Sequence, residues 1–126
     1  MDSAAEGALQ RFREETGFVG QWHKVIVQDA PELLDAYRDF RRAVYDRSVL
    51  DPKVQELIII GVDCFQHWPG IKHHINSALD LGVTRAELVQ TMAVAGLPGG
   101  VHAMAFGLMA LEDVLSERQA SQEGVG

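Results

Sequence analysis

Apolar residues recur at helical spacing along nearly the whole chain, and Gly or Pro residues interrupt this pattern at intervals. Spacings of three and four place apolar side chains on one face of a helix, whereas no segment alternates as a half-buried strand would. The chain is therefore predicted to be all-α. Helices are predicted over residues 4–16, 31–46, 51–66, 71–81, 84–97 and 101–118. Residues 18–30 fit either a short helix or an extended arm.

Residues with capping chemistry mark several of the predicted helix ends. Asp51 precedes Pro52, which is the order expected of an N-cap and a first helical residue. Residues 84–87, Thr-Arg-Ala-Glu, form a capping-box pattern in front of an apolar run. Gly17 and Gly82 follow predicted helices, where a C-cap glycine is common.

Length, charge and cysteine content narrow the class of protein. The 126 residues suit one domain, predicted over residues 1–118, with the polar and small residues 119–126 as a flexible tail. A net charge of −7 leaves no basic surface for nucleic acid. Cys64 is the single cysteine, so no disulfide can form within the chain, and the N-terminus lacks a signal-peptide pattern. We expect a cytoplasmic protein that does not bind nucleic acid.

The longest apolar stretch covers residues 88–111 and is interrupted by Pro98-Gly99-Gly100. Each half has about eleven residues, short of the roughly twenty that a membrane span needs, so a buried helical hairpin is predicted and no membrane contact is expected. Residues 54–65 are also apolar on most sides. Because one small chain can hardly cover three such helices, we expect contacts between copies, and therefore a homo-oligomer.

One polar stripe interrupts the apolar helix that starts at Asp51. A helix turns roughly 100° per residue, which places Glu56, Asp63 and His67 within an arc of about 60°. Burying such groups without partners costs on the order of several kcal/mol. The stripe is therefore expected to face water, an arginine or a functional site, and the helical spacing alone leaves these alternatives open.

The next predicted helix separates its two adjacent histidines. His74 lies at the edge of the inner apolar face, whereas His73 falls on the opposite side, towards solvent. His74 is therefore either a satisfied core histidine or a site residue. His102, on the last helix, is open to the same two interpretations, and Cys64 is interpreted as an inert core thiol.

The segment around Cys64 also contains the residue types that bind zinc. Cys64-x-x-His67 is followed by His73 and His74. However, Cys64 and His67 lie about 60° apart on the helix, and the two later histidines diverge. We therefore predict no metal site. Pro98-Gly99-Gly100 lacks the Lys-Ser/Thr ending of a phosphate-binding loop.

Two sequence segments resemble a known family. The first is Glu56-Leu57 near the start of one helix, and the second runs from His74 through Ala78-Leu79 and Gly82 to Glu87-Leu88. The spacing His-x-x-x-Ala-Leu-x-x-Gly is the specific part. These segments resemble the carboxymuconolactone decarboxylase and alkylhydroperoxidase-D-like superfamily. The resemblance covers roughly residues 31–115 and implies an all-helical bundle with a central antiparallel helix pair, assembled as a homotrimer or homohexamer.

This superfamily has two chemistries, and the sequence favours one of them. Its peroxidase branch uses a Cys-x-x-Cys pair, whose positions match His67 and Gly70 here, so a dithiol cycle within one chain is excluded. Its decarboxylase branch needs no cysteine and has a Trp shortly before the His, where Trp68 stands. The resemblance therefore implies a lyase without a cofactor that acts on a small carboxylic acid or lactone.

The resemblance, read with the residue chemistry, implies three catalytic residues. His74 is expected to donate a hydrogen bond or proton to the substrate, and Glu56 to orient His74 or relay the proton. His67 is expected to act as a second acid or bind the substrate carboxylate. Trp68 is expected to wall the pocket. The other candidates for contact with substrate are Asp63, Cys64 and His102.

Two other functions fit the same sequence. The first is a non-catalytic oligomeric protein that binds a ligand or serves as a scaffold on the same fold. The second is a peroxidase that depends on the Cys64 thiol alone, which predicts that Cys64→Ser abolishes activity.

Overall fold

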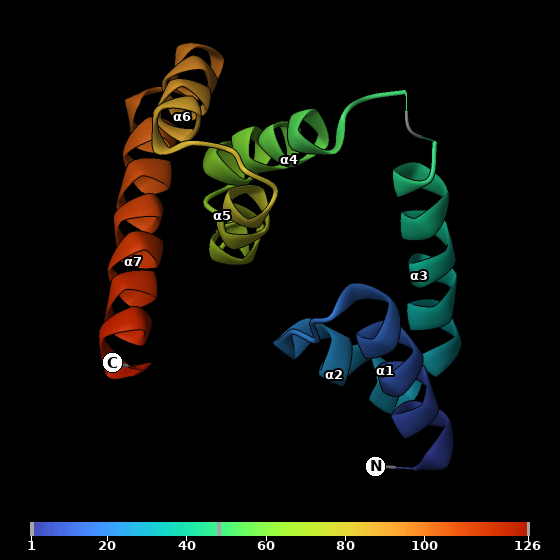
Figure 1. Ribbon diagram of the computed structural model, residues 1–126. Coiled ribbons are helices and arrows are strands. Elements are labelled where there is room, and N and C mark those ends of the chain that lie inside the picture. Colours follow the sequence, from blue (N-terminus) through green and yellow to red (C-terminus); the bar gives the residue numbers. More distant parts are fainter. Residues whose placement is uncertain (1, 48, 126) are drawn as a thin grey trace. The chain divides into compact units, whose positions relative to one another are not determined.

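The computed structural model describes residues 2–47 and 49–125, and every regular element in these ranges is an α-helix (Figure 1). This confirms the predicted all-α class. The helices are α1 (Ser3–Thr16), α2 (Gln21–Asp29), α3 (Pro31–Tyr45), α4 (Pro52–Gln66), α5 (Ile71–Asp80), α6 (Arg85–Gly99) and α7 (Val101–Val125).

Contacts divide the chain into two compact units, residues 1–48 and 49–126. Each unit has its own cluster of buried apolar side chains. The first unit therefore contains α1–α3 and the second contains α4–α7. The single domain expected over residues 1–118 stays a prediction.

In the first unit, α1, α2 and α3 pack around one small apolar core. Ala8, Phe12, Val27 and Leu34 are buried at its centre. α1 ends at Gly17, whose positive φ of 74° is the left-handed conformation that glycine adopts easily. The ambiguous segment 18–30 contains α2, so the helical alternative was the right one of the two.

The second unit packs α4 against α5, α6 and α7, and α6 lies beside α7 (Figure 1). Its core contains one or more buried residues from each of these helices, with Ile60, Ile75, Met92 and Leu111 among them. α4 therefore contacts three neighbours, and the apolar side chains on its remaining surface are exposed: Val54, Ile58, Val62 and Phe65. No helix among the described residues is long and apolar enough to cross a membrane.

Side-chain caps place the N-terminal starts of α4 and α6 where the sequence predicted them. Asp51 accepts a hydrogen bond from the Lys53 backbone N–H at 2.8 Å. The Thr84 hydroxyl accepts from the Glu87 N–H at 3.1 Å, and the Glu87 carboxylate accepts from the Thr84 N–H at 2.9 Å. Both helix starts are therefore fixed by side chains within one turn.

Two predicted ends differ from the structure. α6 includes Pro98 and ends only at Gly99, because a proline in the last turn removes a single backbone hydrogen bond, while the chain turns at Gly100, whose φ is 94°. α7 continues through Val125, beyond the predicted end at Arg118. Residues 119–125 are thus helical, and the flexibility expected of this segment stays a prediction.

Gly107 allows α7 to approach α4 and α6 closely. A Cβ atom at this position would lie 2.5 Å from the Cys64 sulfur and 2.9 Å from Met92 Cγ. Both distances are shorter than real Cβ contacts, so no larger residue fits without a shift of its neighbours. The absence of a side chain at Gly107 is therefore a packing requirement.

We predict that Gly107→Ala lowers the free energy of unfolding by about 1–3 kcal/mol, because the added methyl group overpacks the contact with Cys64. Urea unfolding followed by circular dichroism measures this. The control is Gly61→Ala in α4, where the new Cβ meets Ala95 at an ordinary 3.9 Å, and a gain of about 0.5–1 kcal/mol is expected from helix propensity. Equal effects of the two substitutions would contradict this account.

Candidate active site

Two of the three polar residues in the α4 stripe, Glu56 and Asp63, face the interior, whereas His67 is exposed. Glu56 is 8% exposed and Asp63 is 7% exposed, although both are carboxylic acids. Ile60, between them on the same face, is fully buried. A solvated face is therefore ruled out for these two residues, and each needs a partner inside the second unit.

The partner of Glu56 comes from α5. His74 Nδ1 lies 3.3 Å from Glu56 Oε2, and the two side chains are 21% and 11% exposed. With a proton on Nδ1, the imidazole donates this hydrogen bond and leaves Nε2 for another partner. The structure thus brings together Glu56 and His74, two of the candidate residues proposed from the sequence.

Asp63 completes what we call the carboxyl–imidazole cluster, formed by Glu56, Asp63 and His74. Burial raises the pKa of Asp63 to about 6, the positive charge of His74 acts to lower it, and the negative charge of Glu56 adds to the rise. Its Oδ2 atom is buried and has no hydrogen-bond partner among the described residues. Asp63 therefore interacts electrostatically with Glu56 and His74, but its Oδ2 atom makes no hydrogen bond with a described residue.

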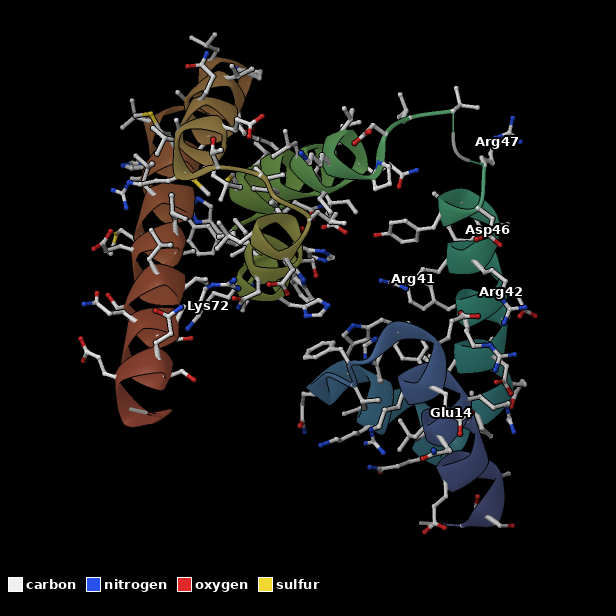
Figure 2. The ribbon with its side chains drawn as sticks, viewed as in Figure 1. Glu14, Arg41, Arg42, Asp46, Arg47 and Lys72 are labelled. Atoms are coloured by element: carbon white, nitrogen blue, oxygen red, sulfur yellow. The ribbon has the colours of Figure 1, made fainter. Side chains whose placement is uncertain are left out.

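Two side-chain links to α7 hold α5, which carries His74, in place. Arg118 donates to Asn76 at 2.8 Å and to Asp80 at 3.1 Å. Lys72 forms an ion pair with Glu117, and Figure 2 shows Lys72 pointing from α5 towards α7. These links escaped the sequence analysis because their partners lie about 40 positions apart, beyond the reach of any local pattern.

His67 ends α4 in an unusual backbone conformation. Its φ of 52° lies in the left-handed region, and its N–H bonds back to the Asp63 and Cys64 carbonyls. The imidazole stacks on the Phe106 ring of α7, with centroids 4.9 Å apart and planes 6° from parallel. Phe106 was not predicted to lie at the site. The signal that could have indicated it is its spacing of four residues from His102, which puts both on one face of α7.

The remaining candidates differ in exposure. Trp68 is 44% exposed in the turn between α4 and α5, and its indole nitrogen lies against Gly70. His102 is exposed in the first turn of α7. Neither side chain has a described contact with the carboxyl–imidazole cluster, and their contact with substrate stays a prediction.

Cys64 is enclosed by the core. It has no exposed surface, and burial raises the pKa of its thiol to about 11, with a further rise from the charge of Asp63. Both effects oppose the thiolate that nucleophilic or peroxidatic chemistry requires. Over residues 2–47 and 49–125, no three His, Cys, Asp or Glu side chains converge in a way that suits a metal ion.

The sequence matches the Carboxymuconolactone decarboxylase family over residues 31–113, a range that contains the whole carboxyl–imidazole cluster. The chain belongs to this family. A relative in Methanocaldococcus jannaschii, described as an uncharacterized protein, is 30% identical over 97 residues, covering 75% of this chain and 93% of the relative. No solved structure gives a significant match.

The burial of Cys64 and the raised pKa of its thiol can be tested by alkylation. We predict that iodoacetamide at pH 8 alkylates Cys64 in the folded protein at least about 100-fold more slowly than in the urea-unfolded protein, because a raised thiol pKa reduces the thiolate fraction and burial blocks access. Mass spectrometry of quenched samples gives both rates. Similar rates in the two states would show an accessible thiolate and would favour the thiol-dependent alternative.

Proposed function

We propose that this member of the carboxymuconolactone decarboxylase family is a lyase that needs no cofactor and removes CO₂ from a small carboxylic acid or lactone acid. The observation that carries the proposal is the Glu56–His74 contact of 3.3 Å between two largely buried side chains. Such a pair can hold and deliver a proton away from bulk water. Family membership supports the reaction class.

The proposed chemistry follows from what decarboxylation of an unsaturated lactone acid requires. When the carbon–carbon bond to the carboxylate breaks, CO₂ leaves and the bonding electrons spread onto the lactone as a dienolate. The protein then has to stabilise the new oxyanion and protonate carbon. Glu56 stabilises the imidazolium form of His74, whose Nε2–H first donates to the oxyanion and then transfers its proton to carbon. His74 becomes neutral and takes up a new proton from water.

His67 and Trp68 are proposed as substrate contacts. His67 ends α4, and the turn that it begins leads into α5, which carries His74. His67 is exposed and its ring stacks on Phe106. It is proposed to act as a second acid or to bind a substrate carboxylate. Trp68 in the same turn supplies an apolar wall, and Asp63 and His102 are further polar contacts.

We predict that His74→Ala and Glu56→Gln each lower kcat/KM at least about 100-fold, because positioned acid–base catalysis contributes about that factor or more. The assay measures CO₂ release from a panel of unsaturated γ-lactone carboxylic acids. Glu112→Gln, which removes an exposed carboxylate of α7, is the matched control and keeps wild-type turnover.

Full turnover by both His74→Ala and Glu56→Gln would reject these assignments. Tight binding of a panel acid by the wild type without CO₂ release would instead favour the non-catalytic ligand-binding alternative. Circular dichroism of each variant shows whether a loss of turnover is a loss of fold.

We also propose that the protein is a homo-oligomer, as a trimer or hexamer. Apolar side chains gather where the end of α4 meets the turn between α6 and α7: a Cβ at Gly99 would lie 3.2 Å from the Phe65 ring, and Leu97 and Val101 flank Gly99 in sequence. Phe65, Leu97 and Val101 are 64%, 84% and 68% exposed. A patch of this kind is better explained by a second copy than by contact with water.

We predict that Leu97→Asp shifts the assembly towards monomer in sedimentation-velocity experiments, because a charge in this apolar patch opposes desolvation. The side chain is too exposed for the change to disrupt the core of its own chain. Gln119→Asp, an exposed position of α7 outside the patch, is the control with the same added charge. A wild-type protein that sediments as a monomer at every concentration would contradict the proposed oligomer.

A further inference from the structure

The two carboxyl groups of the carboxyl–imidazole cluster are buried alike but are not equivalent. Glu56 has a hydrogen-bond partner, His74 Nδ1, whereas Asp63 Oδ2 is buried with no partner among the described residues. As whole residues, both are less than one-tenth exposed. The difference between them is therefore one of hydrogen bonding, which determines which group tolerates a negative charge.

A buried carboxylate is stabilised by a donor and destabilised by the loss of water. Glu56 keeps a donor and, with a protonated ring, an opposite charge. Asp63 has lost water at Oδ2 without gaining a donor there. When the cluster holds one proton on its carboxyl groups, the proton is therefore more stable on Asp63 than on Glu56.

The ionisable groups around Asp63 support this distribution. Glu56, on the same helix, opposes a second negative charge, and His74 from α5 favours it, but the effect of burial exceeds both. Together these effects raise the pKa of the Asp63 carboxyl to about 6.

We propose that Asp63 carries the exchangeable proton of the cluster in mildly acidic solution and presents a carboxylic acid, as a hydrogen-bond donor, to an anionic oxygen of the ligand, while Glu56 keeps its hydrogen bond to His74. The protonation pattern is a property of the free protein. The role towards a ligand rests on the proposed function and narrows it, because it specifies a ligand with a carboxylate or enolate oxygen.

The proton on Asp63 explains how a site with two carboxyl groups can accept an anion. With both groups ionised, an anionic substrate would meet two like charges in a medium of low polarity. With Asp63 neutral, the charges of Glu56 and a protonated His74 cancel, and the Asp63 O–H can donate to the incoming oxygen.

Carbon-13 NMR of the aspartate Cγ atoms in the free, full-length protein tests the protonation pattern. We expect one resonance to titrate near pH 6, roughly two pH units above the exposed aspartates. That resonance is absent in Asp63→Asn and unchanged in Asp113→Asn, an exposed control on α7. Sequential assignment in the wild type identifies the same resonance even where the Asp63 variant does not fold.

The inference is overturned if every aspartate titrates below about pH 5, or if the transition near pH 6 belongs to the Cδ of Glu56. These outcomes leave the proposed lyase intact. Conversely, full turnover by Glu56→Gln and His74→Ala would reject the lyase without moving the Asp63 resonance.

Unfolding provides a second readout. Because the folded pKa of Asp63 lies above its ordinary value of 3.8, the wild type loses stability as pH rises from about 4 to about 6, and the loss persists above pH 6. The urea midpoint of Asp63→Asn, which cannot ionise, should therefore rise relative to that of the wild type between about pH 4 and pH 6 and keep that difference above pH 6. A difference that does not change between about pH 4 and pH 6 counts against the inference.

The role towards a ligand has its own kinetic signature. With a panel acid that the enzyme turns over, the wild-type KM should rise about tenfold per pH unit above pH 6 as the Asp63 donor ionises. An amide donates at every pH, so the KM of Asp63→Asn should stay flat. A wild-type KM that is itself flat from pH 5 to pH 8 would reject the donor role.

Discussion

The contact between Glu56 and His74 makes it possible to place acidic groups inside an apolar helix. α4 packs against three other helices, so a side chain on its inner face has little access to water. A carboxylate in that position needs an opposite dipole or charge, and the imidazole of α5 provides it at 3.3 Å. The links from Arg118 and Lys72 to α5 matter for the same reason, because they fix the helix that supplies the imidazole.

Much of the helical framework could be predicted because its signals are local. Caps at Asp51 and Thr84, and the glycine after α1, act within one turn, so the residues themselves contain the information. The inward position of His74 followed from helical periodicity for the same reason. Pro98 misled the prediction because a proline is tolerated in a last turn, which only the position of the real break at Gly100 reveals.

The chemistry of the site was less predictable, because it depends on groups that meet across helices. Periodicity placed Glu56, Asp63 and His67 on one stripe, but it could not show that two of them are buried while the third lies against Phe106. The lack of a partner for Asp63 Oδ2 and the close approach of Gly107 to Cys64 are both tertiary facts. Their signals in sequence are a single carboxylate and a single glycine, each of which has many ordinary explanations.

His67 shows how a local backbone conformation can oppose the preference of its side chain. The left-handed conformation costs a residue with a Cβ about 1 kcal/mol, and glycine or asparagine would end α4 with less strain. Either replacement would remove the ring that covers Phe106. Replacing His67 by glycine would therefore relieve backbone strain and, at the same time, uncover one face of Phe106, so the two consequences for stability oppose each other.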